Sequence, residues 1–479
     1  MTSEKKQLEA KYFAILLIAF LSVAISVVLP QLLNGWRFWE TFGAAQLAYA
    51  VPTFIAVFTV LLNMTRGIAY MLSPVVSIMV GFLLFLSAGP LINPVSTLYN
   101  IELYTTPAIY QELAGFYGLA VSFFLLGMFL VPKPLLSKES LMRWGFSIHL
   151  DALWFWFLAT VFIILSCFGL LMILNDLTPR TLFFNSGYAG GNGFSNPKSQ
   201  YFVTILQIWN ITGSILAITV FILAPQRKRK FIAIGVIGTI ALYMVSRGVR
   251  FHFIYCLGGT ILVWWYLSQT IDPIGIKKRM KKLWVVGIAI VILTSQMIIV
   301  RNTPGGLPAF INNGGIQLEH LNRLISYDID RNKGFQQTLE AVPHKRDYIR
   351  GRSLVSPFVS WIPRVFWEGK PKTAWAYMEG YSIFENANNS YSILGELHMN
   401  FGRIGILIGM LFSGMFAQRW HDLYLLHSTK IPFIILYAMS LPFFAFFVRG
   451  DFQAAFNSMF YPMLLVFAIL KLSKVRVNI

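Results

Sequence analysis

Stretches of about twenty apolar residues recur along almost the whole chain, and they limit its fold more than any other feature. A helix of about 20 residues, rising ~1.5 Å per residue, crosses a hydrocarbon layer of ~30 Å. The chain is 56% hydrophobic and only 12% charged, against roughly a quarter charged in soluble proteins, so we expect an all-α polytopic membrane protein. We predict about twelve spans, at residues 12–33, 44–62, 68–89, 107–131, 149–174, 201–224, 231–245, 251–270, 284–300, 393–418, 431–448 and 455–470. The first exceeds a signal-peptide core and is expected to be retained.

Basic residues are distributed unevenly between the two sides that these spans define. With a cytoplasmic N-terminus, the inside segments hold 21 Lys/Arg and the short outer loops hold 6. This bias predicts that both termini are cytoplasmic. The basic runs at residues 227–230 and 277–282 are the main anchors on the inside. We therefore attribute the formal charge of +19 to membrane topology and expect no nucleic-acid partner.

One loop is far longer than the others. Residues 301–392 form an outer, periplasmic loop between spans 1–9 of residues 1–300 and spans 10–12 of residues 393–479. Its aromatic density favours a packed structure over a polar linker, and residues 316–342 are predicted to form a surface helix. The aromatic residues include Trp361, Trp367, Trp375 and Tyr381.

Basic residues cluster in the second half of this loop and include Arg352, Arg364 and Lys370. Two interpretations are open. The arginines can pair with the loop's own acidic residues in a folded domain, or they can form an electropositive pocket for an anionic ligand. Arginine suits the second, because its planar guanidinium binds phosphate oxygens in a bidentate manner.

The tenth span carries ionisable residues near its outer end, where a charge needs a partner or a water-filled cavity. In an unbroken helix, Glu396, Asn400 and Arg403 share an arc of about 60°, while His398 lies on the opposite, glycine-rich face. Glu396 and Arg403 can form a structural ion pair or face a substrate cavity. We predict Glu396 ahead of His398 as a general base, because the helical angle directs the histidine toward neighbouring helices.

Arg247 and Arg250 lie in a tight outer turn between the seventh and eighth spans. They can clamp one anionic group or simply extend toward the membrane interface. Cys167 and Cys256 both lie in apolar spans, and the sequence contains no metal-ligand spacing, Walker loop or dinucleotide fingerprint. We therefore expect no metal and no cofactor.

Two stretches resemble the Wzy-type polymerases of oligosaccharide repeat units, which include the O-antigen and enterobacterial common antigen polymerases. The first runs from Gly351-Arg352-Ser353 to Ile362-Pro363-Arg364-Val365-Phe366-Trp367-Glu368-Gly369-Lys370-Pro371, and the second is Leu394-Gly395-Glu396-Leu397-His398-Met399-Asn400-Phe401-Gly402, followed by Gly405, Gly409 and Gly414. The span number, the orientation and the late periplasmic loop are also similar to this family. His398 departs from it, because an aromatic residue is more usual there.

The resemblance implies a GT-C-like bundle in the bacterial inner membrane with an active site facing the periplasm. The implied enzyme is a glycosyltransferase that moves a growing glycan from one undecaprenyl pyrophosphate carrier onto a repeat unit on another. Its partners would be these donor and acceptor lipids, the bilayer, a chain-length regulator and a flippase. Cationic side chains such as Arg247, Arg250, Arg364, Lys370 and Arg403 would stabilise the leaving pyrophosphate, and Glu396 would activate the acceptor hydroxyl.

Two alternatives remain open. An O-antigen ligase uses the same donor and delivers the glycan to lipid A core; the Gly-Glu-Leu-x-x-Asn-Phe-Gly stretch favours the polymerase. A transporter or flippase for the same lipid would show internal repeats and charges near the midplane of several spans, and the sequence has neither.

Overall fold

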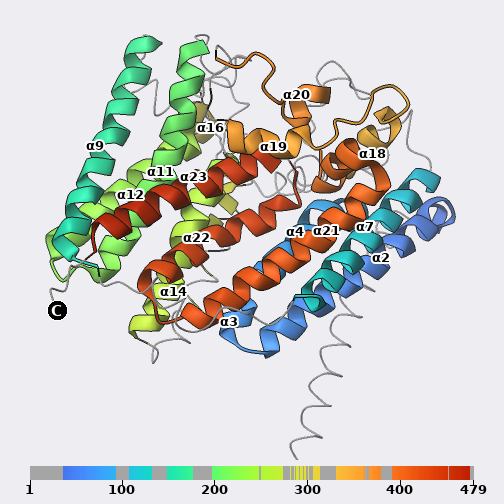
Figure 1. Ribbon diagram of the computed structural model, residues 1–479, viewed down its shortest axis with the longest axis horizontal. Coiled ribbons are helices and arrows are strands. Elements are labelled where there is room, and N and C mark those ends of the chain that lie inside the picture. Colours follow the sequence, from blue (N-terminus) through green and yellow to red (C-terminus); the bar gives the residue numbers. More distant parts are fainter. Residues whose placement is uncertain are drawn as a thin grey trace, which may run out of the picture. The chain divides into compact units, whose positions relative to one another are not determined.

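The computed structural model (Figure 1) describes most of the chain. The described residues are 36–92, 107–131, 148–175, 197–247, 250–272, 306–312, 331–360, 366–378, 391–450 and 452–474, with residues 178 and 362 and scattered positions of 281–300. Within these ranges all regular structure is helical, apart from one isolated bridge between Ile148 and Lys474.

Seven helices of the described chain are long and apolar enough to cross a membrane, which fits a multi-pass membrane protein. They are Leu47–Thr65, Gln111–Phe129, Leu150–Leu174, Phe202–Leu223, Arg227–Ser246, Ile393–His427 and Phe452–Leu472. Each coincides with one of the predicted spans. The predicted span 12–33 lies outside the described residues, and the number of spans and the side of each terminus stay predictions.

Three other predicted spans are shorter or interrupted. Residues 68–89 are divided between α3 (Ile68–Met71), α4 (Pro74–Phe82) and the π-helix η1 (Leu83–Ser87). Residues 251–270 contain α13 (Arg250–Phe253), the π-helix η3 (Ile254–Gly258) and α14 (Gly259–Ile271). The span predicted at 431–448 is α22 (Ile431–Phe447).

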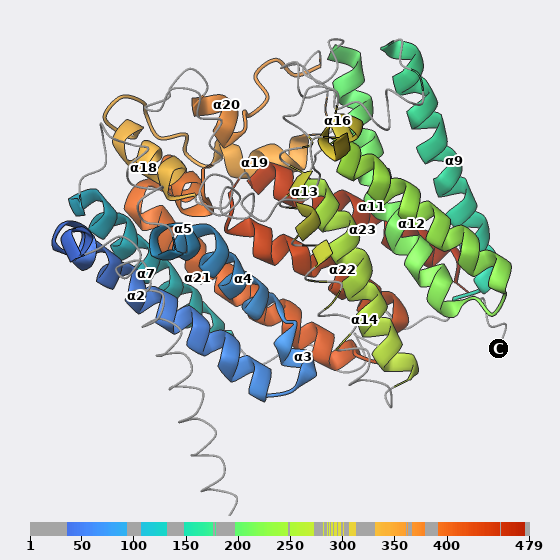
Figure 2. The ribbon, with the colours of Figure 1, turned by 180° about the vertical axis from the view of Figure 1, so that it is seen from behind.

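The chain forms two compact units. The first contains residues 1–133, 325–422 and 444–456, and it holds the described loop residues between 331 and 378. Its further helices are α2 (Trp36–Thr65), α5 (Ala88–Ile92), α7 (Pro107–Phe129), α18 (Asn332–Ala341), α19 (Arg352–Val359), α20 (Ala374–Met378) and most of α21 (Ile393–His427). Figure 2 shows α2, α4 and α7 beside α21.

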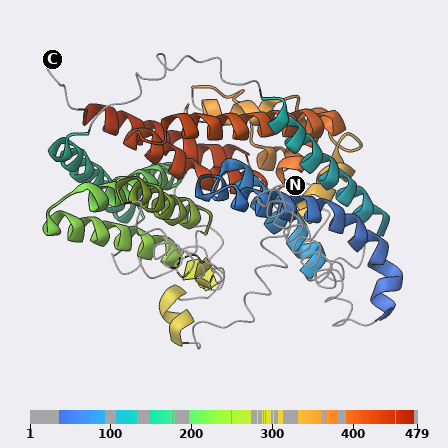
Figure 3. The same cartoon turned by 90° about the horizontal axis from the view of Figure 1, so that it is seen from below.

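The second unit contains residues 134–324, 423–443 and 457–479. It includes α9 (Leu150–Leu174), α11 (Pro197–Leu223), α12 (Arg227–Arg247), α16 (Gly306–Asn312) and the greater part of α23 (Phe452–Leu472). Helices α9, α11 and α12 are packed neighbours in Figure 3.

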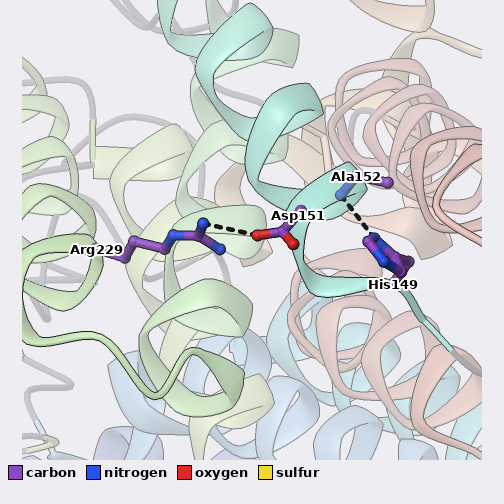
Figure 4. A network of polar contacts seen from close by, with 4 residues as sticks. All are labelled: His149, Asp151, Ala152 and Arg229. Atoms are coloured by element: carbon purple, nitrogen blue, oxygen red, sulfur yellow. Dashed lines mark hydrogen bonds and ion pairs between the residues drawn. The ribbon is translucent and has the colours of Figure 1, made fainter.

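The cytoplasmic anchor predicted at residues 227–230 begins α12 of this second unit. Arg229 Nη2 lies 2.7 Å from Asp151 Oδ1 on α9 (Figure 4). Its guanidinium lies 5.3 Å from the centre of the Trp154 ring. His149 accepts from the amide of Ala152 and caps the same end of α9. These contacts join two helix ends at an exposed surface, which fits an anchoring role for the basic run.

In the first unit, the loop helix α18 is fixed to the π-helix η1. A π-turn interrupts the ordinary hydrogen-bond ladder, so its carbonyls are available to outside donors. The amide of Arg331 donates to Phe85 O and the Asn332 side chain donates to Leu86 O, both at 3.0 Å. Tyr49 on α2 completes the junction by donating to Asn332 Oδ1 at 2.9 Å. The loop helix predicted at 316–342 is therefore present from Asn332 to Ala341, and residues 316–330 lie outside the described residues.

Helix α21 is not straight. Gly402 has φ 69° and ψ −157°, a combination open essentially to glycine alone, and it divides α21 into a short first segment and a long second one. A Cβ on Gly409 would lie 2.5 Å from Leu397 Cδ2, although twelve residues of straight helix would separate these positions by about 18 Å. The first segment therefore folds back against the second.

Glycines also allow α7 and the second segment of α21 to pack closely. A Cβ on Gly414 would lie 2.0 Å from Phe124 O, and a Cβ on Gly127 would lie 2.0 Å from Leu411 O. Small residues at such contacts let two helix backbones approach, as is common between membrane helices. Gly409, which lies on the predicted glycine-rich face of the tenth span, packs against Leu397, and Gly414 packs against α7.

Candidate functional site

Two cavities lie side by side in the first unit, and Tyr348 lines both. We call the larger one, of about 550 Å³, the cationic cavity. It is lined by Asp347, Tyr348, Ile349, Arg350, Arg352, Glu368, Gly369, Lys370, Pro371, Lys372 and Tyr377. Four of these residues are basic and two are acidic, so the lining carries a net positive charge.

A tight backbone turn presents two arginines to the cationic cavity. Arg350 has φ 48° and Gly351 has φ 82°, so two consecutive residues occupy the left-handed region just before α19 begins at Arg352. The turn is held by the amide of Ile349, which donates to Met399 O at 2.9 Å. Left-handed non-glycine residues are strained and often mark functional sites. Both arginine side chains are exposed, and neither forms an ion pair with a carboxylate of the described chain.

Lys370 and Lys372 form the opposite part of the same lining. Lys370 Nζ donates to the carbonyl oxygens of Ser360 and Ile362, at 2.7 and 2.8 Å, where α19 ends. A cation at a helix C-terminus is favoured by the helix dipole, so Lys370 closes α19 as well as lining the cavity. Burial raises the pKa of Tyr377 in this cavity, and the charge of Asp347 adds to the effect.

We call the second cavity, of about 450 Å³, the histidine cavity. It is lined by Glu112, Gln336, Leu339, Glu340, Val342, Pro343, His344, Tyr348, His398 and Arg403. Helix α7 supplies Glu112, α18 and the turn after it supply residues 336–344, and α21 supplies His398 and Arg403. The docking of α18 on η1 therefore sets the position of one wall.

His398 is 4% exposed and has a fixed tautomer. Its Nε2 lies 3.0 Å from Val342 O, and because a carbonyl oxygen can only accept, Nε2 carries the proton. Nδ1 then holds the lone pair, and it has no hydrogen-bond partner among the described residues. The Tyr348 ring stands edge-on to the imidazole, with 6.3 Å between the ring centres.

Arg403 lies at the rim of the histidine cavity. Its Nη2 is 3.0 Å from Glu112 Oε1, and its guanidinium lies 5.5 Å from the centre of the Phe116 ring. The predicted alternatives for Arg403 were an ion pair with Glu396 or a substrate cavity that the two residues face together, and in the structure Arg403 faces a cavity without Glu396. Both depended on an unbroken helix, and both are wrong because the backbone reverses at Gly402.

Glu396 is 1% exposed and lines neither cavity. Its Oε1 accepts from the Ser353 hydroxyl at 2.7 Å, and its Oε2 accepts from the amide of Phe452 at 2.9 Å. Asn400 Nδ2 donates to Ser353 Oγ at 2.8 Å and to Glu396 O at 2.7 Å. The carboxyl group thus joins α19, α21 and the first residue of α23. Its position at the N-terminus of α23 is favourable, because the helix dipole and the backbone amide there stabilise an anion.

The structure therefore divides the predicted site residues into groups. Arg352 and Lys370 share the cationic cavity, and His398 and Arg403 share the histidine cavity. Glu396 and Asn400 belong to the buried network behind Arg352. Outside the described side chains lie the predicted cations Arg247, Arg250 and Arg364, together with Trp361, Trp375 and Tyr381.

Among the contributors to the histidine cavity that the sequence interpretation missed are two acidic residues, Glu112 and Glu340. Glu112 is the only acidic residue of the predicted span 107–131, and a charge at the end of an apolar span is a recognisable signal. Glu340 carries no comparable signal, because it is one of several polar residues in an amphipathic loop helix.

Residues 317–478, about a third of the chain, match a family model described as a domain of unknown function, DUF8712. The matched segment contains every lining residue of the cationic cavity and all those of the histidine cavity except Glu112. No curated protein and no solved structure matches the chain.

Proposed function

We propose that the protein is a membrane-embedded glycosyltransferase that polymerises undecaprenyl-pyrophosphate-linked oligosaccharide repeat units at the periplasmic face of the bacterial inner membrane. The observation that carries this proposal is the pair of adjoining cavities that share Tyr348. One is rich in cations, and the other contains a histidine whose Nδ1 has no hydrogen-bond partner in the part of the chain that the structure describes. Glycosyl transfer from a lipid diphosphate needs both kinds of group next to each other.

In this mechanism the cationic cavity binds the donor diphosphate. The bond from the anomeric carbon to the diphosphate oxygen breaks, and the electron pair leaves with the carrier lipid diphosphate. Arg350, Arg352 and Lys372 stabilise the negative charge that develops there, because they line the cavity and are exposed to it. Guanidinium groups suit this task, since two parallel N–H donors match two phosphate oxygens.

The acceptor hydroxyl forms the new bond to the anomeric carbon and gives up its proton. We assign His398 as the base that receives it, at Nδ1. The Val342 carbonyl fixes the tautomer that leaves Nδ1 unprotonated. Nδ1 is buried, so we infer that Tyr348, whose ring stands against the imidazole, moves when the acceptor enters. Glu396 is a poor base here, because both of its oxygens already accept hydrogen bonds and it lines neither cavity.

The resemblance of residues 351–371 and 394–402 to Wzy-type polymerases supports the donor part of the same assignment, because these stretches supply Arg352 and Lys370. His398 departs from that resemblance, so its role as the base rests on the geometry of the histidine cavity. An O-antigen ligase would use the same donor cavity and a different acceptor. A flippase would need no base. The partners under this proposal are the donor and acceptor lipids, the bilayer, a flippase that delivers the repeat unit and a regulator of chain length.

The test is polymer formation by the purified full-length protein in lipid nanodiscs, with its lipid-linked repeat unit as the sole substrate. We expect a ladder of products on a gel. Arg352→Ala and His398→Ala should each lower the rate by about a hundredfold or more, the range expected for loss of a charge-stabilising or proton-transfer group. Arg66→Ala is the matched control, because Arg66 is exposed in the same unit and lines neither cavity.

One outcome would reject the proposed site, and two others would reject the polymerase. A full ladder from both variants would remove the two cavities from the reaction. Transfer only to an added lipid A core would identify a ligase. Movement of the lipid across the bilayer without any new glycosidic bond would identify a transporter.

A further inference from the structure

The walls of the histidine cavity contain the groups that bind sugar hydroxyls. Glu112, Gln336 and Glu340 supply carboxylate and amide groups, and Tyr348 supplies an aromatic ring. An ionised carboxylate accepts hydrogen bonds at two oxygens, and a side-chain amide accepts at its oxygen and donates from its nitrogen, so these groups match neighbouring hydroxyls of a pyranose ring. A volume of about 450 Å³ is within the range of small-ligand cavities.

One pair in this wall is held rigidly. Gln336 is 1% exposed, and its Nε2 donates to Glu340 Oε1 at 2.8 Å across one turn of α18. The first oxygen of Glu340 is thereby fixed by a buried amide, and the side chain remains half-buried at the cavity surface. The docking of α18 on η1 keeps this wall in place.

The charges of the two cavities differ in sign. In the histidine cavity Arg403 is paired with Glu112, so the two charges offset each other. The charge of Glu340 is not offset in this way, because its partner Gln336 is neutral. The cationic cavity, in contrast, has four basic residues against two acidic ones. A carboxylate on a sugar would therefore be repelled from the histidine cavity and attracted to the cationic cavity.

We propose that the histidine cavity binds the terminal sugar of the acceptor and selects a neutral sugar over an acidic one, with Glu340 as the specificity-determining residue. This inference rests on the proposed function in one respect, the identification of the bound sugar as the acceptor of the transfer reaction. The binding preference itself concerns only the cavity and requires no turnover.

The test uses methyl glycosides of glucose, galactose and rhamnose as neutral probes and the methyl glycosides of glucuronic and galacturonic acid as acidic probes. Binding to the full-length protein in nanodiscs is followed by saturation-transfer NMR, with an excess of inorganic pyrophosphate present to occupy the cationic cavity, which would otherwise attract the acidic probes. We expect at least one neutral probe to bind about tenfold or more tightly than either acidic probe, because like charges brought together are strongly disfavoured. Glu340→Gln should reduce that ratio severalfold, since it keeps the shape of the side chain and removes its charge.

Asp422→Asn is the matched control, because Asp422 lies in the same unit, accepts from Gln418 Nε2 at 2.8 Å across one helical turn as Glu340 does from Gln336, and lines neither cavity. It should leave the ratio in the histidine cavity unchanged. Binding of no probe, equal binding of neutral and acidic probes, or an unchanged ratio in Glu340→Gln would overturn the inference. Failure of the proposed function looks different: the sugar preference would be present while no polymer ladder forms.

Discussion

Arg403 forms its ion pair with Glu112 of α7, at 3.0 Å between Nη2 and Oε1, and not with Glu396, the acidic residue seven positions earlier in its own helix. The reason is the backbone at Gly402, which turns the first segment of α21 back on the second. The reversal places His398 and Arg403 in one cavity and leaves Glu396 inside a network of helix ends.

The Arg403–Glu112 pair should contribute little to stability. The two side chains are 72% and 44% exposed, and exposed pairs contribute roughly 0–1 kcal/mol. We expect Arg403→Ala to change the thermal unfolding midpoint of the purified protein by no more than a few degrees, and to lower polymer formation at least tenfold. The double variant with Glu112→Gln gives the coupling between the two residues. Severe unfolding of Arg403→Ala alone would contradict a functional role at the cavity rim.

Glu396→Ala should be strongly destabilising. It leaves the Ser353 hydroxyl and the Phe452 amide without their acceptor, at a cost of about 1–3 kcal/mol for each buried group. Glu396→Gln keeps one acceptor oxygen and the same shape, so its loss should be smaller. Thermal unfolding and limited proteolysis of the two variants measure the difference.

Glu396→Gln also tests whether His398 or Glu396 is the catalytic base. If Glu396 acts only through α19, Glu396→Gln should weaken binding of inorganic pyrophosphate to the cationic cavity while polymer formation keeps its wild-type pH profile. Loss of one limb of that profile in Glu396→Gln would instead return the role of base to Glu396.

Gly402→Ala should disturb both cavities. The φ of 69° with ψ −157° strains any residue with a Cβ, by on the order of 1–3 kcal/mol, and the new atom would lie 3.1 Å from the Tyr348 hydroxyl. We expect a lower unfolding midpoint and a loss of both pyrophosphate binding and polymer formation. Gly115→Ala on α7 is the control, because a Cβ there meets nothing within 4 Å. Equal behaviour of the two variants would mean that the break at Gly402 is not needed.

Gly414→Ala should separate α7 from α21. The added Cβ would lie 2.0 Å from Phe124 O, so a helix backbone has to shift. We expect destabilisation by about 1–3 kcal/mol, the usual cost of overpacking. Gly118→Ala, with no atom within 4 Å of its Cβ, should be nearly neutral. The shift also changes the distance between Arg403 and Glu112, so crosslinking of cysteines placed at these two positions should become slower in Gly414→Ala.

The loop from 331 to 378 illustrates what sequence patterns can and cannot predict. The cluster of basic residues after Lys345 is visible in the sequence, and the structure brings Arg352 and Lys370 to one cavity. Nothing in the sequence indicates that Asn332 binds the carbonyl of Leu86, because that contact depends on a π-turn 246 residues away in the chain. Glu340 of the histidine cavity could not be predicted for the same reason, since α7 and α18 meet only in the folded protein.

The sequence by itself determined the helical, membrane-type layout, because the length and apolarity of a helix are local properties that a window of about twenty residues contains. It also determined which part of the chain carries the cationic residues. Only the tertiary structure decided which ionisable groups meet. The rule of 100° per residue holds within one unbroken helix, and a single glycine with dihedral angles that other residues avoid moved His398 into a cavity and Glu396 out of it.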